Sequence, residues 1–265
     1  MNFDQYQTLS FSREGRILTI AFNRPDVLNA VNRKLQVEAA RALQEAAADP
    51  GSDVIILTGE GKAFSAGGDV QWMQEALKDP NTFDLEAQAG RALAYALIDC
   101  PKPIIARING DAVGLGATLA LLCDIIIAAD HARIGDPHVR VGLVAGDGGA
   151  VIWPQLIGFA RAKEYLLLGD LIDAPEAARI GLINRSVPAE QLDEVVNGYA
   201  RRLAEGAQMA IRYTKTAVNL QLKQVFNTVF DAGIAYEGLT MASPDHAEAV
   251  QAFLEKRRPR FGRKD

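Results

Sequence analysis

The chain has 265 residues, of which 49% are hydrophobic and 23% are charged, and its formal net charge is −5. This length allows one domain to bury a large core, and the negative charge argues against a nucleic-acid surface, which needs a concentrated positive field. The longest apolar runs are interrupted well before the roughly 18 residues that a membrane-spanning helix needs. Cys100 and Cys123 lie in apolar segments without a second ligand at metal-binding spacing. We therefore expect a soluble, cytoplasmic protein with no metal site and with no nucleic-acid or membrane partner.

Strand and helix patterns alternate through the first part of the chain. Apolar runs bounded by Gly and Pro predict strands, and apolar positions spaced three and four apart predict helices. The predicted elements are a β-hairpin at 7–23, a helix at 32–48, a strand at 53–58, helices at 70–77 and 83–100, and a strand at 104–108. This repeated order implies a core sheet covered by helices.

The later part of the chain becomes helical. A short buried helix follows Gly114, and a second buried strand covers 125–129. Further predicted elements are helices at 149–157 and 160–168 split at Gly158, a helix capped by Asp173, and a strand at 183–187. Residues 190–256 are predicted to be helical throughout. We place a boundary near residue 195, between a mixed core (1–195) and a C-terminal helical region (196–265).

Two glycine-rich turns follow two of the buried strands. The strand at 53–58 leads to GEGKAFSAGGDV, and the strand that ends at Ile108 leads to a turn with Gly114 and Gly116. Turns of this kind leave backbone N–H groups free to bind negative charge. The two turns could therefore converge on one oxygen as an oxyanion hole. Tight turns that serve only packing are the alternative interpretation.

His138 and Asp147 lie nine residues apart in an otherwise apolar and glycine-rich loop. A carboxylate that accepts a hydrogen bond from one imidazole nitrogen fixes the tautomer and raises the basicity of the other nitrogen. This pair is a candidate for proton transfer. The alternative is a structural one, in which a backbone carbonyl satisfies His138 and Asp147 caps the helix that begins near Gly148.

Three segments carry a family resemblance. FSAGGD at 64–69, INGDAVGLGATLALLCDIIIAA at 108–129 and GDPHVRVGLVAGDGG at 135–149 resemble the enoyl-CoA hydratase/isomerase (crotonase) superfamily, in the same order and at similar spacing. The resemblance implies an α/β fold, the crotonase (ClpP-like) spiral of ββα units with a C-terminal helical region. It also implies a homotrimer or hexamer and an acyl-CoA or related small carbonyl substrate, with coenzyme A as part of the substrate and no separate cofactor.

The resemblance assigns residues to the site. The amides of Ala66 and Leu115 would hold the thioester carbonyl oxygen and stabilise an enolate. The residues implied in coenzyme A binding are Asp26, Val27, Leu28, Ala66, Gly67, Gly68, Asp69 and Lys256. For Lys256, the alternative is a solvated basic helix end, KRRPR.

The acid–base positions depart from the family pattern. Family hydratases carry two glutamates where this chain has Thr118 and His138. Threonine is a poor base near neutral pH, whereas histidine transfers protons there. We therefore expect His138, oriented by Asp147, to transfer the catalytic proton.

Three functions are compatible with these residues. Hydration or isomerisation of an enoyl-CoA is the favoured one. The segment DPHVRVGLVAGDGGAVIWPQLIG also resembles the β-diketone hydrolases of the superfamily, which pair a His with an Asp and cleave a carbon–carbon bond with water. A non-catalytic acyl-CoA-binding protein would suit the missing glutamates.

Overall fold

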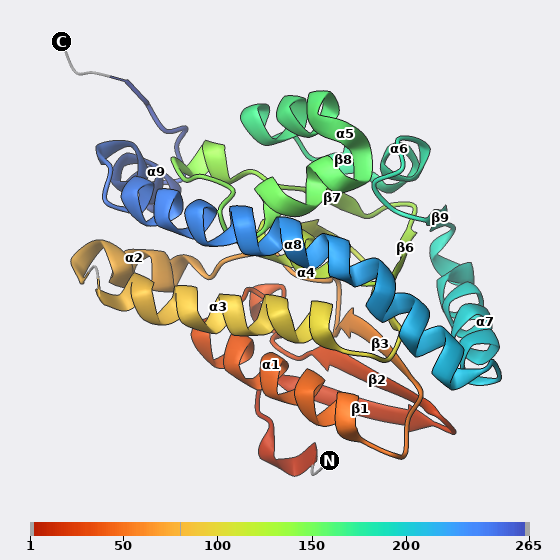
Figure 1. The fold of residues 1–265 in the computed structure, drawn as a ribbon. Coiled ribbons are helices and arrows are strands. Elements are labelled where there is room, and N and C mark those ends of the chain that lie inside the picture. Colours follow the sequence, from red (N-terminus) through yellow and green to blue (C-terminus); the bar gives the residue numbers. More distant parts are fainter. Residues whose placement is uncertain (1–2, 80, 263–265) are drawn as a thin grey trace.

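The computed structural model describes residues 3–79 and 81–262 (Figure 1). The strands are β1 (Leu9–Glu14), β2 (Ile17–Phe22), β3 (Val54–Gly59), β4 (Ile104–Ile108), β5 (Ala112–Val113), β6 (Ile125–Ala129), β7 (Arg133–Gly135), β8 (Ile172–Asp173) and β9 (Arg185–Val187). The α-helices are α1 (Arg33–Ala48), α2 (Val70–Lys78), α3 (Asn81–Asp99), α4 (Leu115–Leu121), α5 (Gly149–Leu168), α6 (Ala174–Arg179), α7 (Leu192–Ala204), α8 (Gln208–Met241) and α9 (Pro244–Leu254). The 3₁₀ helices are η1 (Phe3–Gln5), η2 (Pro25–Val27), η3 (His138–Val141) and η4 (Ala189–Gln191).

The main sheet has the strand order β1-β2-β3-β4-β6-β9. The hairpin β1–β2 is antiparallel and every later pair in this sheet is parallel. Because the strand order follows the chain order, each helical crossover advances the chain in the same direction and produces a spiral. β5, β7 and β8 form a second, smaller sheet. The predicted α/β spiral with a helical C-terminal region is confirmed.

Helices cover both faces of the main sheet. In β3, Ile55 and Leu57 pack in the same cluster as side chains of α1 and α3. Their neighbours Val54 and Ile56 pack instead with α7. Burial on both faces explains why these strands appear in the sequence as continuous apolar runs. No helix within the described residues is long and apolar enough to cross a bilayer.

The predicted boundary near residue 195 is wrong because it falls inside α7. Leu192 and Val196 of this helix are buried against Ile105 and Ile127 of the sheet. Division at residue 195 would expose this face of the sheet to water. α7 therefore belongs to the core, and the helices that extend away from it begin with α8, which crosses in front of the sheet beside α3 (Figure 1).

Local signals within the helices are confirmed. Asn32 caps α1 by accepting a hydrogen bond from Leu35 N, and Asp173 caps α6 by accepting one from Glu176 N. α5 is broken at Gly158, whose φ of 76° is non-helical. The cap at Asp173 and the break at Gly158 are those that the sequence predicts, and the cap at Asn32 is a further finding.

The loops that follow β3 and β4 are joined to each other. Ser65 N donates to Asp111 O at 3.1 Å, and Val113 N donates to Ser65 O at 3.0 Å. Glycine is required where they meet, since a Cβ on Gly116 would lie 2.7 Å from Ser65. This junction brings the two glycine-rich turns to the same edge of the sheet.

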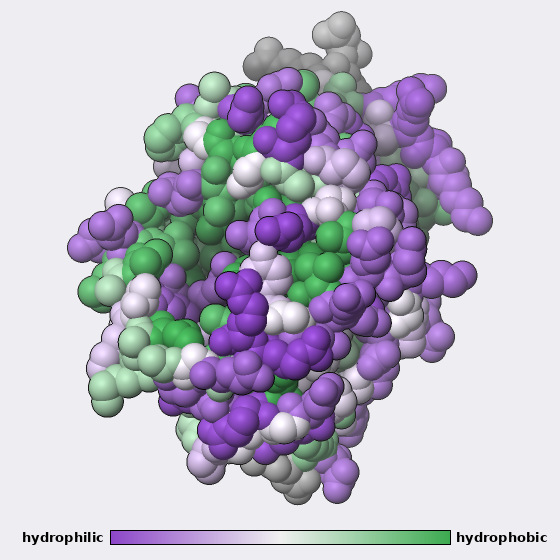
Figure 2. Space-filling view, turned by 90° about the vertical axis from the view of Figure 1, so that its right-hand side faces the viewer, coloured by the Kyte–Doolittle hydropathy of each residue, from purple (hydrophilic) through white to green (hydrophobic). Residues whose placement is uncertain are grey.

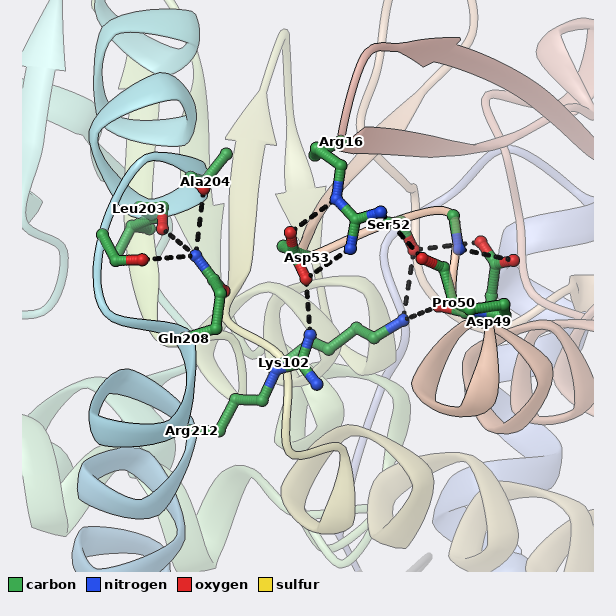
Figure 3. A network of polar contacts seen from close by, with 12 residues as sticks. Arg16, Asp49, Pro50, Ser52, Asp53, Lys102, Leu203, Ala204, Gln208 and Arg212 are labelled. Carbon is green, nitrogen blue, oxygen red and sulfur yellow. Dashed lines mark hydrogen bonds and ion pairs between the residues drawn. The ribbon is translucent and has the colours of Figure 1, made fainter.

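A polar network anchors the start of α8 to the opposite edge of the sheet (Figure 3). Asp53 accepts from Arg16 at the tip of the hairpin and from Arg212 of α8, each at 2.6 Å. Beside them, Lys102 is 1% exposed, and its Nζ donates to Ala46 O, Asp49 O and Ser52 Oγ at 2.5, 2.5 and 3.2 Å. Lys102 is therefore a structural cation that joins the end of α1 to the start of β4.

Replacing Lys102 with alanine should destabilise the protein. The substitution removes the charged donor from two backbone carbonyls and a hydroxyl and opens a cavity, so we expect the free energy of unfolding to fall by about 2–4 kcal/mol. Urea denaturation measures this change. The matched control is Lys223→Ala, which removes an exposed ion pair with Asp99 and should cost less than about 1 kcal/mol. Equal losses in the two variants would contradict the structural role of Lys102.

Candidate functional site

A cavity of about 50 Å³ lies where α1, α2, α3, α4, η3 and α8 meet. Phe230 and Ile234 of α8 form part of its apolar wall. The residues that bring polar side chains or backbone N–H groups to this cavity are Gln36, Gly68, Trp72, Glu86, Leu115, His138, Asp147 and Glu237. An adjoining hollow of about 160 Å³ also contacts Gly68 and His138 and extends along α9. The two spaces could accept the two ends of an elongated ligand.

His138 lies between two carboxylates. Its Nδ1 contacts Asp136 Oδ1, and its Nε2 lies 3.3 Å from Asp147 Oδ2. Asp136 also accepts the backbone N–H of His138 at 3.3 Å, so the carboxylate orients both the ring and the first turn of η3. Burial disfavours the imidazolium, but the two carboxylates outweigh it and raise the pKa of His138 well above its ordinary value. The surroundings of His138 therefore favour its protonated form.

The predicted pairing of His138 with Asp147 needs a correction. The two side chains do meet, but Asp147 faces Nε2, and Asp136 is the residue that orients the ring through Nδ1. Sequence reasoning missed Asp136. The available signal was its position two residues before His138, from which a carboxylate can cap the backbone N–H of the residue that it orients.

Thr118 is linked to the acid–base pair through Asp147. Thr118 Oγ1 donates to Asp147 Oδ1 at 3.2 Å, which leaves Oδ2 of the same carboxylate facing His138. Thr118 is fully buried in α4. The glutamate expected at position 118 is thus absent from the sequence, while a carboxylate from a different segment is held beside that position.

The expectation that Ala66 supplies a free amide is wrong. Its N–H donates to Leu28 O at 2.9 Å, so it is already engaged. Two residues later, the amide of Gly68 has no acceptor among the described residues, and neither does the amide of Leu115 at the start of α4. Gly68 and Leu115 both line the cavity that contains His138. The available pair of backbone donors is therefore Gly68 and Leu115.

Glu237 of α8 is an additional acid at the same cavity, and sequence reasoning missed it. It is 5% exposed, and its Oε2 has no partner among the described groups. Burial raises the pKa of Glu237 to about 8, although the charge of His138 opposes the shift. The signal was its place on the buried stripe of α8, with Phe226, Phe230 and Met241. An acid on an apolar stripe needs a partner or a function.

The residues expected to bind coenzyme A fall into two places. Asp26, Val27 and Leu28 form an exposed turn that touches the 66–69 loop through the Ala66–Leu28 hydrogen bond. The carboxylate of Asp69 is engaged, since it caps α2 and pairs with Arg24 at 2.9 Å. Lys256 is exposed just beyond α9, whose residues Ala249, Val250 and Phe253 line the adjoining hollow.

The three residues Asp136, His138 and Asp147 are also close enough to be considered as metal ligands, since their ligand atoms lie within 4.8 Å of one another. However, each imidazole nitrogen already faces a carboxylate, on opposite edges of the ring. This arrangement suits the transfer of a proton along the three groups.

Comparisons with known proteins identify the family of the chain. The family model for enoyl-CoA hydratase/isomerase matches residues 12–264. A probable enoyl-CoA hydratase of Mycobacterium bovis and a crotonyl-CoA hydratase of Syntrophomonas wolfei are each 36% identical, over 97% of this chain and 98% of the relative. The crystal structure of an enoyl-CoA hydratase/isomerase from Mycobacterium paratuberculosis superposes with a TM-score of 0.89 at 35% identity, covering 93% of this chain and 99% of that one.

Glu237 makes stability depend on pH in a defined direction. Because its folded-state pKa is raised above 4.5 to about 8, the neutral acid favours the folded state, and this contribution is lost as the pH rises through that range. Glu237→Gln cannot ionise, so its stability relative to the wild type should increase by at least about 1 kcal/mol between about pH 5 and pH 9. Urea denaturation across this range measures it. Exposed Glu194→Gln is the control, and a pH-independent difference for Glu237→Gln would contradict the assignment.

Proposed function

Because the chain belongs to the enoyl-CoA hydratase/isomerase family, we propose that it acts on an acyl-CoA thioester and catalyses the hydration or isomerisation of an enoyl-CoA. One observation carries the proposal: His138 and Asp147 face each other at a cavity that is also lined by two backbone amides with no acceptor in the described part of the chain. One side of such a site stabilises negative charge and the other side moves protons.

The amides of Gly68 and Leu115 would bind the thioester carbonyl oxygen. When water adds to the β carbon of an enoyl thioester, negative charge develops on this oxygen as an enolate. Two fixed N–H donors stabilise the charge without reorganising, which is the largest contribution in many reactions of this kind. The same interaction would serve isomerisation, which also passes through an enolate.

His138 and Asp147 would supply the acid and the base. Asp147, held by Thr118, accepts a proton from water while the hydroxide oxygen bonds to the β carbon. The imidazolium of His138 then gives its Nε2 proton to the α carbon of the enolate. Asp147 returns its proton to Nε2 across the 3.3 Å contact, which restores the starting state. Throughout, Asp136 holds Nδ1 and keeps the ring in place.

Coenzyme A would follow the surface that leads out of the cavity. The exposed turn at Asp26, Val27 and Leu28 adjoins the 66–69 loop, and α9 borders the hollow next to His138. Lys256 lies just beyond α9 and would offer a cation to a phosphate. These positions support the coenzyme A contacts that the family resemblance implies.

A β-diketone hydrolase is the second candidate, and the Asp136–His138 contact favours it. A carboxylate on Nδ1 is the arrangement by which a histidine is oriented for hydrolysis. In this reaction water would attack one ketone carbon, the carbon–carbon bond would break, and the resulting enolate would be protonated. Coenzyme A would not be needed.

A homotrimer or hexamer is part of the proposal. Hydrophobic side chains gather in a hollow on the face shown in Figure 2. A groove of about 570 Å³ runs between α5 and the first half of α8. Exposed apolar residues lie along α8, namely Met209, Tyr213, Val218, Leu220, Tyr236 and Leu239. Patches of this kind commonly mark subunit contacts.

Assays with two substrates should separate the candidate functions. We expect the purified protein to convert crotonyl-CoA to its hydrated product, detected as the gain of one water by mass spectrometry and the loss of the enoyl absorbance. Cleavage of a β-diketone without affinity for acyl-CoA would support the hydrolase instead. Binding of acyl-CoA without any turnover would indicate a binding protein and would refute the proposed reaction.

Removing the acid–base pair should abolish most of the activity. His138→Ala should lower kcat by about 10² to 10⁴, because the proton donor to the enolate is lost. Asp147→Asn should lose a large part of the same factor. The double variant should be little worse than His138→Ala, because groups that act as a unit are non-additive. Steady-state kinetics of the three variants measures this, and full activity of His138→Ala would require another proton donor.

A further variant distinguishes orientation from general damage to the site. Asp136 raises the pKa of His138, so Asp136→Asn should lower it and move the alkaline limb of the pH–kcat profile to lower pH. Asp170→Asn, which removes a carboxylate paired with Arg140 at the surface, is the control and should leave the profile unmoved. An unshifted limb in Asp136→Asn would contradict the role of this carboxylate.

A further inference from the structure

The side of the cavity formed by α1, α2 and α3 contains polar groups that have no partner within residues 3–79 and 81–262. Gln36 of α1 is 5% exposed and its Oε1 has no hydrogen-bond partner among the described residues. Trp72 of α2 has a buried indole Nε1–H that likewise finds no acceptor there. Both residues line the same cavity as His138. A donor and an acceptor are thus left open at the wall of one binding space.

A flip of the side-chain amide of Gln36 would still leave one of its polar groups without a hydrogen-bond partner. Gln36 Nε2 donates to Glu86 Oε2 at 3.0 Å, and Oε1 lies close to Gly90, where an added Cβ would be 3.2 Å away. If the amide were flipped, Glu86 in its neutral form could donate to the oxygen, but the NH₂ group would then be unpaired. Unpaired buried polar groups are costly, so their persistence in a cavity indicates a ligand group that completes them.

The charge of the cavity restricts which ligand group can pair with Gln36 and Trp72. Asp136 and Asp147 already place negative charge beside His138. Burial raises the pKa of Glu86 to about 7, although Arg33 opposes the shift. A carboxylate on the acyl chain of the ligand would be repelled by these charges. A neutral hydroxyl can accept from the indole N–H and donate to the amide oxygen.

We infer that the acyl pocket selects thioesters whose acyl chain carries a hydroxyl group away from the thioester, bound by Gln36 and Trp72. This inference rests on the proposed function only in taking an acyl-CoA as the ligand. It adds a second recognition site within the cavity, apart from the groups that would perform the reaction. Glu86 is a positioning residue in this arrangement, because it holds the amide of Gln36.

The test compares binding of saturated thioesters, which cannot be hydrated. Calorimetry would measure Kd for acyl-CoA thioesters from pentanoyl to octanoyl. Each is compared with a thioester of the same chain length that carries a hydroxyl on the carbon next to the terminal one. We expect at least one hydroxylated thioester to bind about tenfold or more tightly than its plain partner, because the plain chain leaves both polar groups unpaired. A matched chain that ends in a carboxylate should bind more weakly than the hydroxylated one.

Two variants identify the groups responsible. Gln36→Leu and Trp72→Phe should each bring the ratio of the Kd of the plain thioester to that of the hydroxylated thioester toward one. If one variant fails to fold, the other still provides the test. The control is Gln44→Leu, an exposed position on the same helix, which should keep the wild-type ratio. Equal affinities in the wild type, an unchanged ratio in both variants, or tighter binding of the carboxylate would each overturn the inference. A hydroxyl preference without turnover of any enoyl-CoA would overturn only the proposed reaction, whereas no binding of any thioester would overturn both.

Discussion

A buried imidazole held between two carboxylates determines the electrostatics of this cavity. A charged histidine alone would be unstable in the interior, but Asp136 and Asp147 contact its two nitrogens and stabilise the imidazolium. The three groups together carry negative charge, so a further ionised acid beside them would be unfavourable. Burial is the main cause of the raised pKa of Glu237, which α8 places at the same cavity, and the two carboxylates add to the shift while the charge of His138 opposes it.

The backbone donors depend on hydrogen bonds made elsewhere in the two loops. Ala66 N–H is engaged by Leu28, and Gly114 N–H is engaged by Gly135. These bonds fix the loops but do not use the amides of Gly68 and Leu115, which belong to residues that line the cavity. The close approach of the loops in turn requires glycine at position 116, where any side chain would collide with Ser65. The same turns therefore provide both the packing of the loops and the two open amide donors.

The two glutamates of the family pattern are absent, but ionisable side chains still lie at or beside both positions. Thr118 cannot act as a base, but it holds Asp147, which brings a carboxylate from the loop before α5 to the side of α4. His138 occupies the second position, and its neighbouring carboxylates raise its pKa and favour the imidazolium. An acid and a base remain available, and this supports an enzyme over a protein that only binds its ligand.

The sequence by itself determined the α/β spiral, most elements, the two glycine-rich turns and the choice of His138 as a candidate site residue, because periodicity, caps and glycine motifs act over short distances along the chain. Only the tertiary structure decided which groups meet. It replaced Ala66 with Gly68 as the free donor, added Asp136 and Glu237, and assigned α7 to the core. The physical reason is that hydrogen-bond partners such as Leu28 for Ala66, and burial such as that of Glu237, arise from segments far apart in the chain, so no local pattern records them.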